Sequence, residues 1–491
     1  MSFTQKGRSR FLLSAHIALI AVGAAVFTAF AFHKNIWFDE AYTIGLVSHG
    51  FSEILKIHTA DVHPFLYYVL LKTFTLVFGS SLLSLRMFSV VGAVLFSSLG
   101  LTHIRRDHGE KVGFFFSFFA VFSASVLLYA EQIRMYSWAM LIVALAGIYA
   151  YRVGKKGGKQ NSILFVLFSV CAAYTHYYAL FAVAAINLVM LILAVREKKK
   201  LGAWLARASV QIFAYIPEAA VFFKQAVSGG ASWIKLSFPD NIFNTLAYPF
   251  LGELLSDVIG NRVAFFAVGI GLVVLFASAC VLLFCRKRHL LKEDAFRWAL
   301  EIFFGVIAFS LIVSLFRPIY YERYTVVLYG FLFFAFARAV SEMKKPTRII
   351  AAVLVVCIFA VQTYRFSGKC FGETKERAET LFEEKIGGDD IVVSSSTDIY
   401  CFSVFRPNGK FYFYNKGKWN IKEAYAAFEE NACVIESLDI PEIVGCEGSI
   451  FVINDGKTRD HLIAKGFSQT EKISFFSAYG NKTYEIARLD R

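Results

Sequence analysis

Long apolar runs separated by short polar connections form the main pattern of this chain. The first run, residues 11–32, has 22 residues without a formal charge, enough to cross a bilayer as a helix. It is too long for a signal-peptide core and has no small-residue cleavage pattern, so it predicts a retained span. Together with it, ten further runs predict about eleven transmembrane helices: 83–104, 112–130, 137–151, 161–174, 179–195, 201–222, 262–284, 298–316, 325–340 and 349–363.

The connections between these runs alternate in charge. One set, which begins with residues 1–10, contains 21 Lys and Arg, whereas the other contains 7 although it includes the longest loops. Loops rich in Lys and Arg remain in the cytoplasm. The difference therefore predicts a multi-pass protein with a cytoplasmic N-terminus, and it places everything after residue 364 outside the cytoplasm.

One apolar segment does not fit the series of spans. Residues 65–79 are apolar, but the segment has only 15 residues and includes Lys72. Counting it as a span would invert every later loop and place the basic clusters outside. We interpret it as an amphipathic helix at the outer interface, which makes residues 33–80 a long external loop.

The last part of the chain alternates between two kinds of local pattern. Short β-rich runs occur in IVVSSS (391–396), KFYFYN (410–415) and SIFVIND (449–455), and helical patterns occur in residues 373–386, 421–430 and 458–467. Such alternation predicts a small α/β domain. We therefore expect a transmembrane domain over 1–363 and an extracytoplasmic α/β domain over 364–491, whose role cannot be deduced from its residues.

Composition supports a membrane protein. Hydrophobic residues make up 57% and charged residues 18%, and the mean hydropathy is +0.55, which excludes soluble, disordered and coiled-coil proteins. The net charge of +14 comes from short clusters between spans, so it reflects topology rather than nucleic-acid binding. The eight cysteines show no metal-binding spacing.

Polar and aromatic residues gather at the outer ends of the predicted spans. Ionisable groups close to hydrocarbon are costly and indicate function. For Tyr and Arg, anchoring at the lipid headgroups is an alternative, but the carboxylates of Asp39, Glu40 and Asp61 gain nothing from lipid. The five motifs are FDEAYT (38–43), DVHPFLYY (61–68), EQIRMYS (131–137), THYYAL (175–180) and RPIYYERY (317–324).

These motifs, in this order, resemble the GT-C glycosyltransferases, in particular the family 39-like bacterial branch related to protein O-mannosyltransferases and aminoarabinose transferases. The resemblance covers roughly the first 330 residues. Phe65 departs from it, since these proteins often have a second proline there. The resemblance implies an active site at the acidic motif of the first external loop. It also implies a sugar donor carried on a polyprenyl phosphate.

The resemblance maps the catalytic base onto Asp39. An inverting transfer needs a group that removes the proton of the acceptor hydroxyl. Adjacent residues do not easily point the same way, so Glu40 is expected to orient a neighbour, although Glu40 as the base remains an alternative. Asp61 is the third catalytic candidate.

The phosphate that leaves the sugar needs fixed positive charge nearby. Arg134 and Arg323 are the candidates, with snorkelling toward lipid headgroups as the alternative. Glu131 is three residues before Arg134, so the two would share a helix face and could pair. The other expected substrate-binding residues are His63, Tyr136, His176, Tyr177 and Tyr324.

A divalent-metal site made by Asp61, His63 and His176 is conceivable from the ligand types alone. Their spacing is not diagnostic, and we expect no metal and no cofactor. More simply, Asp61 and His63 shape the donor or acceptor pocket.

The sequence thus predicts an inverting glycosyltransferase of the cell membrane, with a polyprenyl-phosphate sugar as donor and an extracytoplasmic glycan, lipid or protein as acceptor. One alternative is a lipid-linked sugar flippase or transporter, which would require ionisable residues within spans and broken helices. Another is a membrane glycan polymerase or ligase that uses the same donors.

Overall fold

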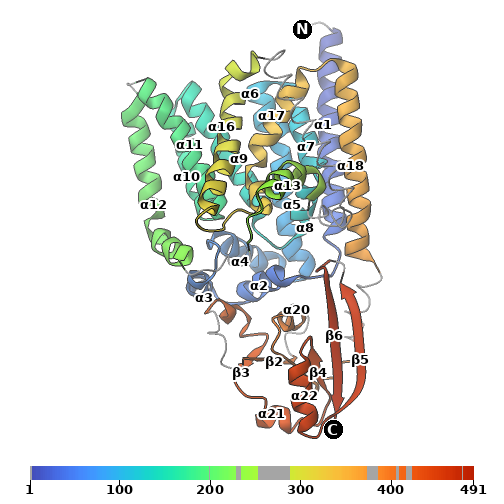
Figure 1. The fold of residues 1–491 in the computed structure, drawn as a ribbon. Helices are drawn as coiled ribbons and strands as arrows, with labels where there is room; N and C mark the ends of the chain where they lie inside the picture. Colours follow the sequence, from blue (N-terminus) through green and yellow to red (C-terminus); the bar gives the residue numbers. More distant parts are fainter. Residues whose placement is uncertain are drawn as a thin grey trace. The chain divides into compact units, whose positions relative to one another are not determined.

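The computed structural model describes residues 3–197, 200–227, 234–252, 288–372, 385–404, 409–415, 423–477 and 479–491. The chain divides into two compact units (Figure 1). Residues 1–31 and 86–364 form the first, here called the helical unit, and residues 32–85 and 365–491 form the second, the sheet unit. The predicted external loop thus groups with the C-terminal residues, and the predicted domain boundary after residue 363 stays a prediction.

Helices follow the predicted spans closely. The predicted span 262–284 lies outside the described residues, as does most of the helix predicted over 373–386. The helices of this part of the chain are α1 (Phe3–Phe30), α5 (Leu82–Leu99), α6 (Arg105–His108), α7 (Glu110–Val121), α8 (Ala124–Glu131), α9 (Tyr136–Lys156), α10 (Lys159–Ala173), α11 (Tyr177–Arg196), α12 (Leu201–Val227), α13 (Phe238–Leu251), α16 (Asp294–Ser314), η6 (Glu322–Leu328), α17 (Tyr329–Ser341) and α18 (Lys345–Phe371).

Among the described residues, seven helices are long and apolar enough to span a membrane, and a bent pair brings the number to eight. The predicted span 112–130 is this pair: α7 and α8 meet at an angle of 62°. The break occurs where the Ser123 side chain accepts a hydrogen bond from the backbone N–H of Val126 and so caps α8. The chain is a polytopic helical membrane protein, but α10, with 15 residues, is shorter than a usual span.

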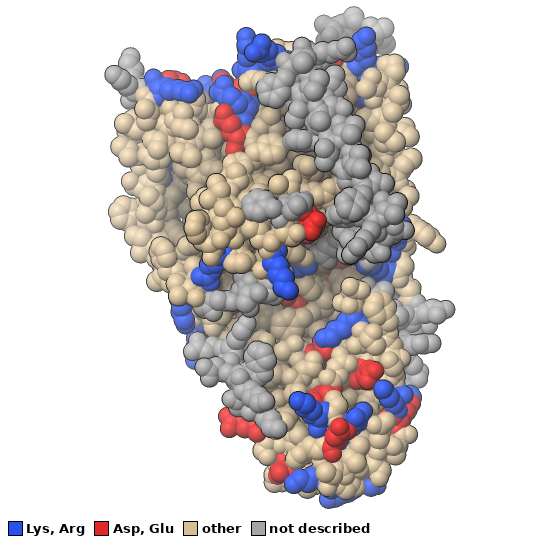
Figure 2. All heavy atoms as spheres, in the orientation of Figure 1, with Lys and Arg blue, Asp and Glu red and all other residues tan. Residues whose placement is uncertain are grey.

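Ion pairs join the helix ends where several basic loops meet. Arg152 Nε lies 2.6 Å from Asp107 Oδ2, and Arg338 Nε lies 2.8 Å from Glu293 Oε2. In Figure 2 the flank of the helical unit is largely tan, and Lys and Arg gather at its upper end. These basic loops therefore share one end of the unit, which we call the basic end. Which side of the membrane it faces stays a prediction.

The sheet unit contains one six-stranded mixed sheet with strand order β3-β2-β1-β4-β6-β5. The first four strands are parallel, whereas β6 is antiparallel to both β4 and β5. The predicted α/β fold of the C-terminal region is therefore confirmed. The strands are β1 (Ile391–Ser394), β2 (Lys410–Tyr414), β3 (Cys433–Ile435), β4 (Ile450–Ile453), β5 (Ser468–Ser477) and β6 (Lys482–Asp490).

Short helices surround this sheet. The C-terminal ones are α20 (Ile399–Ser403), η7 (Glu423–Phe428), α21 (Pro441–Val444) and α22 (Gly456–Ala464). The external loop adds α2 (Phe38–Ser48), α3 (Phe51–Ile57), η1 (His58–Ala60) and α4 (Leu66–Phe78). The last of these is the helix predicted over 65–79, and its apolar end is exposed, with Val77 73% accessible. Its place at a membrane surface stays a prediction.

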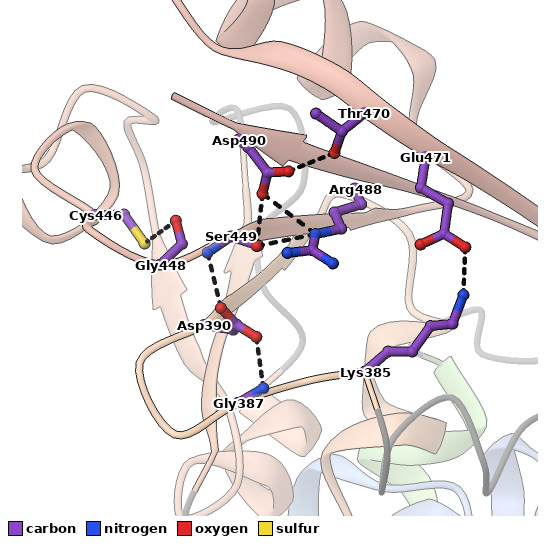
Figure 3. A network of polar contacts seen from close by, with 10 residues as sticks. All are labelled: Lys385, Gly387, Asp390, Cys446, Gly448, Ser449, Thr470, Glu471, Arg488 and Asp490. Atoms are coloured by element: carbon purple, nitrogen blue, oxygen red, sulfur yellow. Dashed lines mark hydrogen bonds and ion pairs between the residues drawn. The ribbon is translucent and has the colours of Figure 1, made fainter.

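A polar network fixes the edge of the sheet where β1 and β4 begin (Figure 3). The Asp390 carboxylate accepts hydrogen bonds from the backbone N–H groups of Gly387 and Ser449, the latter at 2.7 Å. Ser449 Oγ in turn donates to Asp490 Oδ1 at 2.6 Å, and Arg488 Nε lies 3.2 Å from the same oxygen. Side chains of the unit therefore join β1, β4 and β6 at this edge of the sheet.

Candidate active site

The acidic motif of the external loop lies in the first turn of α2. Carboxylates are favourable there because the N-terminus of a helix carries partial positive charge. The two adjacent carboxylates differ in accessibility: Glu40 is 0% exposed, whereas Asp39 is only partly buried. Successive side chains on a helix point about 100° apart, so one carboxylate is directed into the sheet unit while its neighbour stays accessible.

Glu40 has a partner from the C-terminal part of the same unit. The Tyr479 hydroxyl donates a hydrogen bond to Glu40 Oε2 at 3.1 Å. Tyr479 lies in the turn between β5 and β6, and its ring centroid is 4.7 Å from that of the buried His33. No motif or periodicity in the sequence points to Tyr479.

Asp61 is held by a tyrosine of its own motif. The Tyr68 hydroxyl donates to Asp61 Oδ2 at 2.9 Å, and Asp61 is only 8% exposed. The ring of Tyr68 lies 6.4 Å from that of Tyr42 on α2. Asp61 is therefore linked to the helix that carries Asp39. His63, two residues further on, is partly exposed.

A second group of predicted residues lies in the helical unit, at the ends of α8 and α9. Arg86 Nε is 3.8 Å from Glu131 Oε2, and both side chains are 0% exposed. Arg134 is also buried, at 2%. The predicted shared helix face of Glu131 and Arg134 is wrong, because α8 ends at Glu131 and Arg134 lies in the turn before α9.

Aromatic rings and one imidazole connect this turn to two other loops. The ring of His176 lies 5.6 Å from that of Tyr136 and 5.3 Å from that of Tyr324. Its Nδ1 accepts a hydrogen bond from the backbone N–H of Tyr178 at 3.1 Å and so caps α11. The structure thus brings together five of the predicted substrate-binding residues. We call Arg86, Glu131, Arg134, Tyr136, His176 and Tyr324 the buried polar cluster.

Burial sets the protonation state of the imidazole in this cluster. Loss of water, followed by the nearby positive charge of Arg134, lowers the pKa of His176 to about 3. The ring is therefore neutral near pH 7, which its role as a hydrogen-bond acceptor from Tyr178 also requires. The positive charge of the cluster comes from its guanidinium groups.

Two predicted residues lie at the margin of this group. Arg323 is partly buried, and its guanidinium carbon is 5.3 Å from the ring centroid of Tyr321. Tyr177 is directed toward α12, where its hydroxyl donates to Gln225 and its ring lies 5.0 Å from that of Phe222. Tyr177 therefore contacts a neighbouring helix.

Arg86 is the functional candidate that the sequence analysis missed although a signal was present. It is the only charged residue within the predicted span 83–104, and a charge inside a span indicates function by default. Tyr129, whose ring lies 4.5 Å from that of Tyr136, gave no such signal because it is one of many aromatic residues.

A metal site would require the side chains of Asp61, His63 and His176 to converge. In the described ranges, no group of three or more His, Cys, Asp or Glu side chains is arranged to hold a metal ion. Asp61 and His63 belong to the sheet unit and His176 to the helical unit.

Comparison with models of protein families found no match, and comparison with curated proteins found none. Solved structures with the same fold do exist. ArnT from Cupriavidus metallidurans in the apo state matches with a TM-score of 0.57 and 10% identity, covering 96% of this chain and 97% of that one. The same protein bound to undecaprenyl phosphate matches with a TM-score of 0.58 over the same shares. The chain therefore shares the overall fold of these ArnT structures.

Proposed function

We propose that this membrane protein is an inverting glycosyltransferase that moves a sugar from a polyprenyl-phosphate donor to an extracytoplasmic acceptor. The observation that carries the proposal is the fold shared over 96% of the chain with ArnT, one structure of which is bound to undecaprenyl phosphate. That ligand is the part of a polyprenyl-phosphate sugar that remains after transfer. The cytoplasmic N-terminus and the extracytoplasmic sheet unit belong to the same proposal.

Asp39 is the base in this reaction. The acceptor oxygen attacks the anomeric carbon from the face opposite the phosphate, and its proton passes to the Asp39 carboxylate. Accessibility supports Asp39 over Glu40, because Glu40 is fully buried. Asp61, fixed by Tyr68, together with His63, orients the acceptor.

The bond between the anomeric carbon and the phosphate oxygen breaks as the new bond forms. Its electron pair stays with the phosphate, which leaves as polyprenyl phosphate with one more negative charge. Arg134 and Arg86 stabilise that charge, because guanidinium groups in a buried site act on phosphate far more strongly than in water. The ion pair with Glu131 holds the Arg86 guanidinium in place, and Arg323 lies at the margin of the cluster.

Transfer with defined donors tests this function. Purified protein is incubated with synthetic undecaprenyl phosphates that carry a radiolabelled hexose, pentose or amino sugar, and a cell-envelope extract supplies acceptors. We expect one donor to give labelled product with inverted anomeric configuration. If no donor gives labelled product, or if the configuration is retained, the proposal fails.

A lipid-linked sugar transporter is the second candidate, because the 62° break between α7 and α8 is the kind of discontinuity found in transporters. Vesicles that contain the protein and a fluorescent polyprenyl-phosphate sugar separate the two. A transporter equilibrates the label between leaflets without acceptor, whereas the proposed transferase leaves its distribution unchanged. A glycan polymerase or ligase would differ from the proposed enzyme only in its acceptor.

A further inference from the structure

The sheet of the sheet unit has a feature that usually marks a ligand site. In open α/β sheets, ligands bind beyond the carboxyl ends of the strands, at the point where the strand order reverses. Here that point lies between β1 and β4, because the chain proceeds from β1 through β2 to β3 on one side and then places β4 on the other. The question is what occupies the corresponding edge.

Side chains of the unit itself connect this edge. Asp455, which follows β4, accepts a hydrogen bond from the backbone N–H of Ser395, which follows β1, at 2.7 Å. Asn454 donates to Asp398 Oδ2 at 2.7 Å, and Lys482 at the start of β6 lies 2.5 Å from Asp398 Oδ1. These contacts join β1, β4 and β6 and lead directly into α20, which starts after Asp398.

From this edge, an aromatic stack continues to α2. The rings of Tyr400 on α20 and Phe428 on η7 are stacked at 3.9 Å. The ring of Phe428 lies 5.9 Å from both Phe38 and Tyr42 on α2. The approach is close at Gly45, where a Cβ atom would lie 2.6 Å from the Ala427 carbonyl oxygen, so a larger residue would force α2 away from η7.

The β5–β6 hairpin makes the second connection to α2. Beyond its last pair, Ser477 with Lys482, the turn presents Tyr479, whose hydroxyl donates to the fully buried Glu40. Glu40 is adjacent to Asp39 in the first turn of α2. A hydrogen bond at Glu40 therefore fixes the rotation and depth of the turn that carries Asp39.

We propose that the C-terminal part of the sheet unit positions α2, the helix that carries Asp39, with Tyr479 as a positioning residue that acts through Glu40 on Asp39. The inference rests on the proposed function for the role of Asp39. It assigns a task to the C-terminal α/β region, to which the close approach of η7 at Gly45 also belongs.

The test compares Tyr479→Phe with Tyr412→Phe, a matched control on β2 in the same unit. Loss of a hydrogen bond to a charged group predicts that kcat for sugar transfer falls about tenfold in Tyr479→Phe. In Tyr479→Phe, KM for the donor stays within about twofold of the wild-type value. In the control Tyr412→Phe, both kcat and KM stay within about twofold of the wild-type values. In a Glu40→Ala background, Tyr479→Phe causes no further loss, because the two residues act as one unit.

A structural readout keeps the inference separate from the proposed function. Hydrogen exchange of residues 38–48 is expected to become faster in Tyr479→Phe but not in Tyr412→Phe. If wild-type protein transfers no sugar, the proposed function fails while this exchange experiment still decides whether Tyr479 holds α2. Unchanged exchange in Tyr479→Phe overturns the inference, and so does a further tenfold kcat loss when Tyr479→Phe is added to Glu40→Ala.

Discussion

The two ends of the helical unit both contain ion pairs, but the pairs differ in their environment. At the basic end, Lys155 pairs with Asp294 while the two side chains remain 46% and 33% exposed, although Arg152 and Asp107 pair there at only 3% and 6% exposure. In the buried polar cluster, Arg86 and Glu131 pair at 0% exposure. Exposed pairs contribute little because water already solvates them, whereas a buried pair costs several kcal/mol in lost hydration. Burial alone does not distinguish the two ends, because Arg152 and Asp107 are buried as well. Under the proposed function we assign the chemistry to the buried polar cluster because Arg134 and His176 lie there beside the pair.

The largest difference between the two ends should appear when a buried pair is broken. Arg86→Met leaves the Glu131 carboxylate buried without its guanidinium partner, which we expect to destabilise the protein by about 3–5 kcal/mol. Thermal unfolding in detergent measures this loss. Restoring neutrality with Arg86→Met plus Glu131→Leu should recover most of the stability, and a double variant as unstable as the single one would show that the pair is not the cause.

A charge-preserving change at Arg134 tests the proposed phosphate contact. Arg134→Lys keeps the charge but loses the planar, two-pronged donor, so we expect sugar transfer to fall about a hundredfold, or about 2.7 kcal/mol. Arg338→Lys, at the basic end, is the matched control and should transfer sugar at the wild-type rate. If the two substitutions lowered the rate of sugar transfer equally, the assignment of the phosphate contact to Arg134 would be contradicted.

The imidazole of the cluster predicts a pH dependence of stability. The folded pKa of His176 is about 3, below the unfolded value of about 6.5, so the unfolded chain binds one more proton between these values. Stability therefore falls as the pH falls through this window, by about 1.4 kcal/mol per pH unit and about 2 kcal/mol by pH 5.

His176→Asn is the matched variant for this experiment, because asparagine caps helices well but does not titrate. Unfolding midpoints between pH 7.5 and 5 should decline less steeply in the variant than in the wild type. Parallel curves would mean that His176 does not contribute.

The smallest effect is expected at the basic end. Lys155→Met removes the ion pair with Asp294, both of whose side chains are accessible to water, and should cost less than about 1 kcal/mol. The same thermal unfolding assay measures it. A loss as large as that of Arg86→Met would contradict this comparison of an exposed pair with a buried one.

The sequence was sufficient for features that depend on local pattern. The length of the apolar runs located most of the helices, and the short β-rich runs located β1, β2 and β4. The break at Ser123 was not predictable, because Phe122 and Ser123 lie in a continuous apolar run with no proline, and its one glycine, Gly113, is nine residues before Phe122. As a result the sequence analysis placed Glu131 and Arg134 on one helix, although α8 ends between them.

Contacts between distant segments could not be predicted from the sequence, for a different reason. Tyr479 is 439 residues away from Glu40, and a tyrosine in a polar hairpin gives no periodic signal that would connect it to a carboxylate. Arg86 could have been found, since a charge inside a predicted span is itself a signal. Its partner Glu131, however, became evident only from the packing of the helices.

The most direct test of the central claim is the single-turnover rate of sugar transfer in Asp39→Asn, measured with donor bound at saturation and compared with wild type and with Glu40→Gln. Removal of a general base predicts a rate about 10²–10⁴ times slower in Asp39→Asn, with donor affinity unchanged and a smaller loss in Glu40→Gln. Transfer at the wild-type rate in Asp39→Asn would contradict the account.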